Sequence, residues 1–251
     1  MPPRKSSRPA AKRPSGRKAV AKKRAAGATS AKKKVRALSA YNAKRDFSRT
    51  AEPEGKAPPT TTGRSLQFVI QKHAASHLHF DLRLEVDGVM KSWAVPKGPN
   101  YDPSVRRLAM EVEDHPMEYN TFEGTIPKGE YGGGTVMIWD RGVYGPEADG
   151  GERALHAGYK RGDLKFVMDG SRMHGGWVLV RTRRDERGRA QWLLIKHRDA
   201  FAKDGFDIVE EATTSIVTGR TMEEIARGAT PRKRGGKKRT AKSGFGRRVH
   251  T

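Results

Sequence analysis

Apolar and polar residues alternate strictly over residues 78–86. The apolar positions are Leu78, Phe80, Leu82, Leu84 and Val86, and the polar positions are His79, Asp81, Arg83 and Glu85. Because successive side chains of a strand point to opposite faces, the pattern predicts a half-buried strand with its apolar face in the core. The polar face lines up an imidazole, a carboxylate and a guanidinium, with about 6–7 Å between successive groups.

Short segments of strand character follow one another along the chain. They are residues 67–72, 78–86, 89–95, 107–113, 134–140, 163–168, 176–183 and 191–197. Asp87-Gly88 between two alternating runs predicts a two-residue hairpin, and Gly175-Gly176 and Arg187-Gly188 predict further turns. Residues 48–66 have the composition of an extended loop, and helical character is confined to 207–227. This organisation predicts a mostly β protein with one antiparallel barrel or sandwich domain and short C-terminal helices.

Positive charge is concentrated at the two ends of the chain. The net charge is +23, and residues 1–40 and 228–251 carry 14 and 9 Lys or Arg residues with no acid in either segment. The middle, 41–227, holds 28 basic and 28 acidic residues and is neutral. The end segments have almost no large apolar residues with which to offset chain entropy. We therefore predict a folded domain over 41–227 between disordered tails at 1–40 and 228–251.

Basic tails of this kind bind nucleic acid without reading its sequence, through salt-sensitive contacts with phosphates. The densest positions are Lys32, Lys33, Lys34, Lys237, Lys238 and Arg239. A solubilising role, or binding of another polyanion, is the alternative. Nucleic acid is the partner that this composition favours.

The location of the protein is constrained by what the sequence lacks. No apolar run approaches the ~20 residues needed to cross a bilayer, and no apolar stretch follows the N-terminal charges as in a secretory signal. The absence of cysteine excludes disulfides and thiolate ligands and fits a reducing compartment. We therefore expect a cytoplasmic, nucleoid-associated protein without a membrane partner, in which any metal is held by His, Asp, Glu or water.

His73, His79 and Asp81 form a candidate metal site. Two imidazoles and a carboxylate leave positions on a divalent metal open for water and substrate. The alternative is a set of solvated polar residues on the outer face of a sheet. His77 falls either on the apolar face of the alternating strand or in the preceding turn, and both positions favour a structural role. Arg83, one pleat beyond Asp81, either clamps a phosphate or forms an ion pair with a neighbouring carboxylate.

A second candidate group follows the strand predicted at 107–113. His115, fixed by the neighbouring Pro116, either binds a phosphate, protonates a leaving oxygen or caps a turn. The glycine-rich segment 122–134 lacks the residues of a phosphate-binding P-loop and is expected to form tight turns at a barrel rim. The Lys-x-Asp-Gly motif to which DNA ligases attach AMP is absent, because no Asp-Gly pair has a lysine two residues before its aspartate; at Asp87-Gly88 and Asp169-Gly170 that position holds Glu85 and Val167.

Taken together, these motifs resemble the 3′-phosphoesterase domain found in bacterial ATP-dependent DNA ligase D and as stand-alone proteins. The resemblance covers about 41–199. It rests on Lys44-Arg-Asp-Phe47, Glu52-Pro53, Gln71-Lys-His73, Leu78-His-Phe-Asp-Leu-Arg83, Lys91-Ser-Trp-Ala-Val-Pro-Lys-Gly98 and Val112-Glu-Asp-His-Pro116.

The resemblance implies a small β-barrel with the site in a groove on one face. It implies Mn²⁺ on His73, His79 and Asp81, with Arg83, His115 and Tyr119 engaging the phosphate. The remaining positions that it marks as important are Arg45, Asp46, Glu52, Gln71, Lys97 and Arg107. The first three lie in a segment that we expect to fold over the groove.

The activity implied by the resemblance removes a 3′-terminal ribonucleotide from DNA, then the 3′-phosphate, and leaves a 3′-OH. The expected partners are such DNA ends and, in end joining, a Ku-like end-binding protein, a ligase and a polymerase. We expect a stand-alone protein whose basic tails supply DNA affinity. Two alternatives are a non-catalytic DNA-binding scaffold that recruits ligase or polymerase, and a general nuclease that cleaves internal phosphodiesters.

Overall fold

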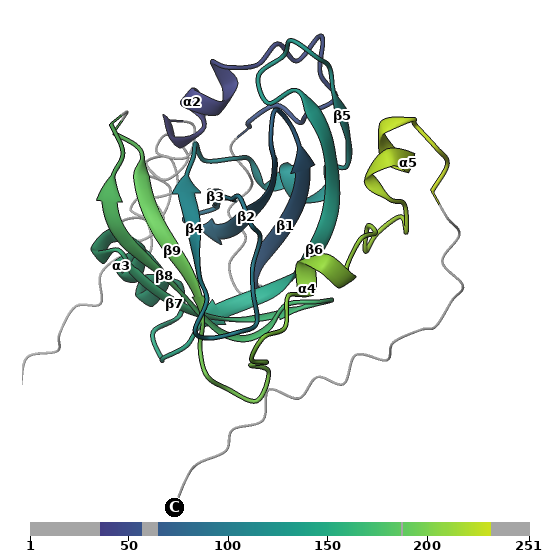
Figure 1. The fold of residues 1–251 in the computed structure, drawn as a ribbon. Coiled ribbons are helices and arrows are strands. Elements are labelled where there is room, and N and C mark those ends of the chain that lie inside the picture. The colour runs from purple at the N-terminus through teal and green to yellow at the C-terminus, as the bar shows by residue number, and fades with distance from the viewer. Residues whose placement is uncertain (1–35, 57–64, 187, 232–251) are drawn as a thin grey trace, which may run out of the picture.

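Nine strands dominate the part of the chain that this computed structural model describes, which is residues 36–56, 65–186 and 188–231 (Figure 1). They are β1 (Leu66–Ala74), β2 (Leu78–Val86), β3 (Val89–Val95), β4 (Arg106–Glu111), β5 (Gly124–Ile126), β6 (Gly134–Pro146), β7 (Asp163–Gly170), β8 (His174–Arg184) and β9 (Ala190–Lys196). Neighbouring strands pair in the order β1-β2-β3-β4-β9-β8-β7-β6, and β6 pairs with β1 to close a barrel. Every pairing is antiparallel, which confirms the predicted antiparallel β-barrel.

The β2–β3 hairpin has the turn that the sequence predicts. Asp87 and Gly88 both have positive φ, at 55° and 74°, as the two central residues of a type I′ turn require. Other boundaries differ from prediction. β6 runs well past residue 140, β4 ends before 113, and Gly175-Gly176 lies inside β8 rather than in a turn. The glycine-rich segment also contains β5, a short strand paired with the start of β6.

Short helices connect and cover the strands. They are α2 (Ser39–Asn42), the 3₁₀ helix η1 (Met117–Thr121), α3 (Gly151–Arg161), α4 (Ile208–Glu211) and α5 (Met222–Ala226). The two C-terminal pieces confirm the helical character of 207–227. α3 lies outside 207–227, so the prediction that helices are confined to that segment was wrong. Its apolar face is narrow because only Leu155 and Gly158 are buried, and Gly158 lies against β7, where an added Cβ would be 2.8 Å from the Asp163 carbonyl oxygen.

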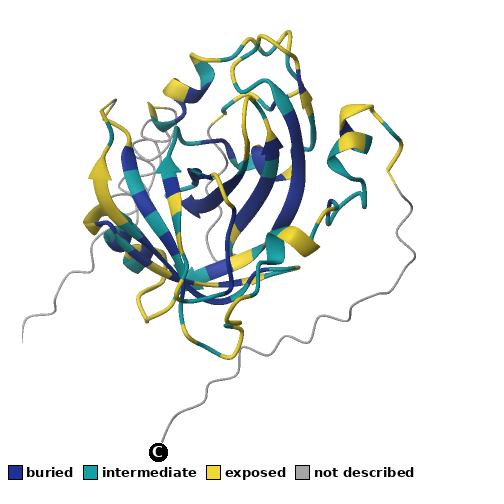
Figure 2. Ribbon diagram, in the orientation of Figure 1, coloured by how far each residue is buried: buried dark blue, intermediate teal, exposed yellow. Residues whose placement is uncertain are grey.

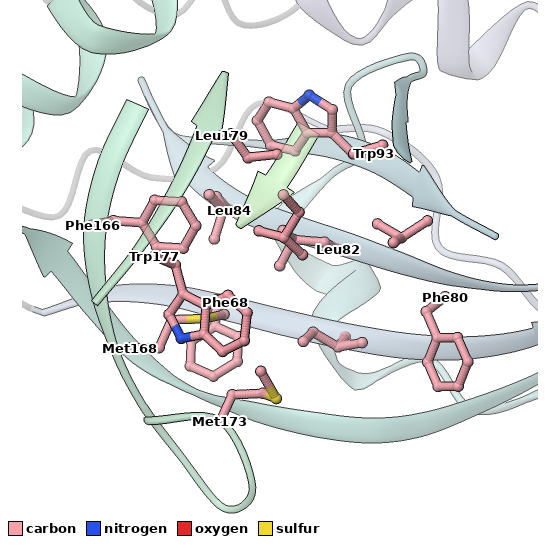
Figure 3. Packing of buried hydrophobic residues seen from close by; sticks show 14 of the residues in the cluster. Phe68, Phe80, Leu82, Leu84, Trp93, Phe166, Met168, Met173, Trp177 and Leu179 are labelled. Atoms are coloured by element: carbon pink, nitrogen blue, oxygen red, sulfur yellow. The ribbon is translucent and has the colours of Figure 1, made fainter. Parts of the chain in front are cut away.

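The barrel interior is the main core. It contains the four tryptophans Trp93, Trp139, Trp177 and Trp192, all fully buried. Figure 3 shows how Leu82 and Leu84 of β2 and Phe166 of β7 meet in this interior. The strand residues are accordingly the most continuously buried part of the molecule (Figure 2).

The outer face of β2 is also covered, which corrects the prediction of a half-buried strand. Asp81, Arg83 and Glu85 are buried along with the apolar residues, whereas Leu78, predicted to face the core, is 50% exposed. A second apolar cluster lies over this outer face and contains Tyr41, Tyr119, Phe122, Ile126 and Val136. Segments distant in sequence from β2 therefore close over its polar side chains.

The packed chain begins before residue 41, because Leu38 is fully buried. The predicted tail residues 1–35 and 232–251, which include Lys32, Lys33, Lys34, Lys237, Lys238 and Arg239, lie outside the described residues. Within the described part of the chain, no helix is long and apolar enough to span a membrane.

Candidate metal and phosphate site

The candidate site is built on the outer face of β1, β2 and β3. The antiparallel register places His73 opposite His79 and Gln71 opposite Asp81. On the other side of β2, Ser92 lies opposite Arg83. Because Phe80, Leu82 and Leu84 face the barrel interior, the polar residues between them share the outer face. The hydrophobic alternation of β2 therefore fixes the direction in which its site residues point.

His73, His79 and Asp81 come together as a cluster. Their potential ligand atoms all lie within 4.8 Å of one another. His73 Nδ1 is 3.5 Å from one Asp81 carboxylate oxygen, and His79 Nε2 is 3.7 Å from the other. Among the described residues, this is the group of histidines and carboxylates arranged to hold a metal ion.

Backbone carbonyl groups fix the tautomer of each imidazole. His73 Nε2 lies 2.9 Å from the Gly132 carbonyl oxygen, and His79 Nδ1 lies 2.9 Å from that of His77. A carbonyl can only accept, so the facing ring nitrogen carries the proton. The opposite nitrogen of each ring faces Asp81 and is the atom available to a metal ion. This is how proteins orient metal-binding histidines, and two nitrogens with one carboxylate suit a divalent transition metal.

Arg83 is buried next to the cluster and donates to two side-chain acceptors. Its Nε donates to Gln71 Oε1 at 2.8 Å and its Nη2 donates to Asp81 Oδ2 at 3.1 Å. Its Nη1 lies 2.9 Å from His115 Nδ1, a nitrogen that also lies 2.9 Å from the Glu113 carbonyl oxygen. Burial by itself would raise the pKa of Asp81, but Arg83 and the two imidazoles lower it below its ordinary value. Asp81 is therefore ionised and ready to bind a cation.

A β-bulge brings His115 to Arg83. Trp93 pairs with Glu111 in the regular ladder, and Met90 pairs with His115 in an isolated bridge. The step from Trp93 back to Met90 is three residues, but the step from Glu111 on to His115 is four, so one extra residue is inserted. Such a bulge turns a side chain that would otherwise point away.

His115 is fully enclosed between two guanidinium groups. Arg83 approaches Nδ1, and Arg45 Nη2 lies 3.4 Å from Nε2. Burial, then Arg83, then Arg45 hold the pKa of His115 well below its ordinary value. The imidazole is therefore neutral at physiological pH.

The segment 45–52 folds over the site, as predicted. Arg45 Nε donates to Glu52 Oε1 at 2.9 Å, and the Tyr119 hydroxyl donates to the same oxygen at 2.9 Å. Gln71 Nε2 donates to the carbonyls of Tyr119 and Phe122 at 3.1 and 2.9 Å. The Tyr119 ring lies 4.7 Å from the Arg83 guanidinium carbon. Burial, the largest effect, raises the pKa of Tyr119 well above its ordinary value, so this hydroxyl remains protonated.

Three residues marked by the resemblance lie outside this network. Asp46 is exposed and uses its carboxylate to accept hydrogen bonds from Ser48, which shapes the turn after Arg45. Lys97 is exposed two residues past Val95, which pairs with Phe80, and so lies at the end of the sheet that carries His79. Arg107 pairs with Asp207 at 2.5 Å. Their roles in substrate binding stay predictions.

Several residues of the network were missed in the sequence. Glu113 accepts from Lys44 at 3.1 Å and from Arg45 at 3.3 Å, and Ser92 lies 3.3 Å from His115 Nδ1. The two-residue hairpin fixes the β2–β3 register, so the position of Ser92 opposite Arg83 was available from the sequence. His77, expected to be structural, lies in the turn before β2 and contributes only its carbonyl.

The fold and the cluster together define a class of protein, an antiparallel β-barrel whose outer wall carries a candidate metal site beside a buried arginine. Comparison with known proteins gives the particular family. Residues 71–181 match the family described as the DNA ligase D 3′-phosphoesterase domain. The barrel of this chain therefore belongs to the ligase D 3′-phosphoesterase domain family.

Curated relatives agree with this family. The chain is 46% identical over 206 residues to the multifunctional non-homologous end joining protein LigD of Pseudomonas aeruginosa, which covers 79% of this chain and 24% of that protein. It is 45% identical over 167 residues to the multifunctional non-homologous end joining DNA repair protein LigD of Mycobacterium tuberculosis, which covers 66% of this chain and 20% of that protein. The chain thus spans less than a quarter of the length of these relatives.

Proposed function

We propose that this chain is a metal-dependent phosphoesterase that heals DNA 3′ ends during double-strand-break end joining. Its reactions are removal of a 3′-terminal ribonucleotide and hydrolysis of the resulting 3′-phosphate. The observation that carries the proposal is the contact between the His73–His79–Asp81 cluster and Arg83 within a barrel of the 3′-phosphoesterase domain family. The names of the relatives, which describe end joining, support the process.

In this proposal His73, His79 and Asp81 hold Mn²⁺, although the same ligands also accept other divalent transition metals. A bound divalent metal lowers the pKa of a coordinated water toward neutrality and polarises a phosphoryl group. Side chains next to the metal cluster bind the phosphate. Arg83 has five N–H donors, of which Gln71 and Asp81 accept two, so others remain for phosphate oxygens.

We assign His115 to phosphate binding rather than to proton donation. Burial and two guanidinium groups lower the pKa of His115 and oppose the imidazolium form, which favours a hydrogen bond from the neutral ring to the phosphate. Tyr119, protonated and stacked on Arg83, keeps that guanidinium in place. DNA ends with a 3′-ribonucleotide or 3′-phosphate are the proposed substrates, and a Ku-like end-binding protein, a ligase and a polymerase are the proposed partners.

The test uses a 5′-labelled primer–template that ends in one 3′-ribonucleotide. It is incubated with Mn²⁺ or EDTA and with wild-type, His79→Ala or His77→Ala protein, and the products are resolved on a denaturing gel. We expect metal-dependent shortening to a 3′-phosphate and then to a 3′-OH, lost in His79→Ala and kept in His77→Ala. An unchanged primer that still binds the protein on a native gel would favour the scaffold alternative, and internal cleavage would favour a general nuclease.

A further inference from the structure

An exposed aromatic ring lies at the rim of the candidate site. Tyr131, in the glycine-rich turn between β5 and β6, is 45% exposed. The carbonyl of the next residue, Gly132, accepts the hydrogen bond of His73 Nε2. The ring is therefore attached one residue away from the group that orients a candidate metal ligand.

A second set of contacts connects the Tyr131 ring to the phosphate side of the site. The Tyr131 hydroxyl lies 3.4 Å from Glu113 Oε2 and accepts from Lys44 Nζ at 3.0 Å. Glu113 in turn contacts Arg45, whose Nη2 approaches His115. The ring is therefore linked through neighbouring residues both to the metal cluster and to His115.

We propose that the Tyr131 ring stacks on the base of the 3′-terminal nucleotide and positions the adjacent phosphate. The proposal rests on the proposed function, which places the phosphate at Arg83 and His115. Every base has a π face, so stacking accepts any terminal nucleotide, as an enzyme that processes broken ends requires.

The charges around the ring fit this substrate. Lys44 Nζ lies 4.6 Å from the ring centroid and the Arg45 guanidinium carbon lies 5.3 Å from it. Lys44 is the accessible cation of the two, with a side chain that is 40% exposed, whereas Arg45 is buried and paired with Glu52 and Glu113. The ring therefore combines an aromatic platform with one accessible cation that suits the 5′-side phosphate of the terminal nucleotide.

The competing explanation is that Tyr131 only stabilises the conformation of the glycine-rich turn, through the hydrogen bonds of its hydroxyl. The Arg49–Glu130 ion pair, at 2.9 Å, also stabilises this turn. Two substitutions at Tyr131 distinguish a role of the ring from a role of the hydroxyl. Tyr131→Phe removes the hydroxyl contacts and keeps the ring, whereas Tyr131→Leu keeps apolar bulk and removes the aromatic face. Phe201→Leu is a matched control, since Phe201 is 48% exposed and stacks on His174 outside the site.

The experiment places 2-aminopurine as the 3′-terminal base of a primer–template, in EDTA so that no turnover occurs. Stacking on tyrosine quenches its fluorescence. We expect wild type, Tyr131→Phe and Phe201→Leu to quench it on binding, and Tyr131→Leu to bind without quenching. In parallel, with Mn²⁺ and a 3′-ribonucleotide, Tyr131→Leu should raise KM about tenfold with kcat within about twofold.

Two results would overturn the proposal. Equal loss of quenching in Tyr131→Phe and Tyr131→Leu would assign the residue to fastening the turn. Full quenching in Tyr131→Leu would show that the Tyr131 ring does not stack on the terminal base. Both are measured without metal or catalysis, so they remain informative if the end-healing activity itself is absent.

Discussion

At the scale of single residues, the site depends on how backbone carbonyls orient two imidazoles. The His73 and His79 rings are each fixed by one carbonyl, from Gly132 and His77. The ring nitrogens available to a cation face Asp81. Little rearrangement is then needed on binding, which favours affinity.

Metal binding should stabilise the folded protein. A ligand that binds only the native state at one hundred times its Kd adds about 2.7 kcal/mol to the free energy of unfolding. Thermal unfolding of wild type should therefore shift to a higher Tm with Mn²⁺. His79→Ala should lose the shift and His77→Ala should retain it, because His77 contributes only its carbonyl. Equal shifts in both variants would place the metal elsewhere.

His115 makes stability depend on pH. In the folded protein, burial, Arg83 and Arg45 lower its pKa, whereas an unfolded chain has a histidine pKa of about 6.5. On acidification the unfolded chain takes up this proton first, so stability falls as the pH drops below about 6.5, by up to about 1.4 kcal/mol per pH unit. Urea denaturation should show a smaller decline for His115→Gln. An unchanged decline would mean that His115 is protonated in the folded state.

At the scale of elements, Glu52 joins the N-terminal segment to the barrel wall. Its carboxylate accepts from Arg45 at 2.9 Å and from the η1 residue Tyr119 at 2.9 Å. Arg45 also lies over the Tyr41 ring of α2, at 3.8 Å. One buried carboxylate therefore holds together the pieces that close over the outer face of β2.

Neutralising Glu52 should loosen this cover. Glu52→Gln removes the nearer of the two carboxylates, Glu52 and Glu113, that pair with the buried Arg45, and removal of one partner of a buried ion pair costs up to about 3–5 kcal/mol. Glu54→Gln is the matched control, because its 3.2 Å contact with Lys56 is exposed and should cost less than about 1 kcal/mol. Chemical denaturation measures both. A Glu52→Gln protein as stable as Glu54→Gln would show that the cover does not depend on this charge.

At the scale of the whole molecule, charge and site are separated along the chain. Residues 1–35 and 232–251 carry 13 and 9 Lys or Arg residues, whereas the site lies in the neutral middle. The described chain starts at residue 36, close in sequence to Tyr41 and Arg45 of the site cover. The N-terminal basic segment is therefore joined directly to the cover.

Removing residues 1–35 and 232–251 should weaken DNA binding and flatten its salt dependence. The slope of log K against log salt is negative, and each lost phosphate contact reduces its magnitude by about 0.9. Turnover of saturating substrate should change little, because the site residues remain. Binding titrations at several salt concentrations, with kcat measured alongside, test this. A truncated protein with the wild-type slope would show that the barrel itself supplies the phosphate contacts.

The sequence by itself determined the elements of the barrel and the direction of the β2 side chains. Alternation with a period of two places Asp81 and Arg83 on one face, and Asp87-Gly88 sets the register of the hairpin. Both are local properties of the chain. α3 was missed because its apolar face is narrow, and β5 because glycines surround it.

Only the tertiary structure decided what covers the polar face of β2. Burial of Arg83 depends on η1 and on the segment from Tyr41 to Glu52, which are far from β2 in sequence. The position of His115 depends on a one-residue bulge, which no local pattern marks. The partners of Arg107 and Tyr131 could not be predicted either, because non-local packing decides which side chains meet. Arg107 pairs with Asp207, and Tyr131 lies at the rim of the site beside Lys44.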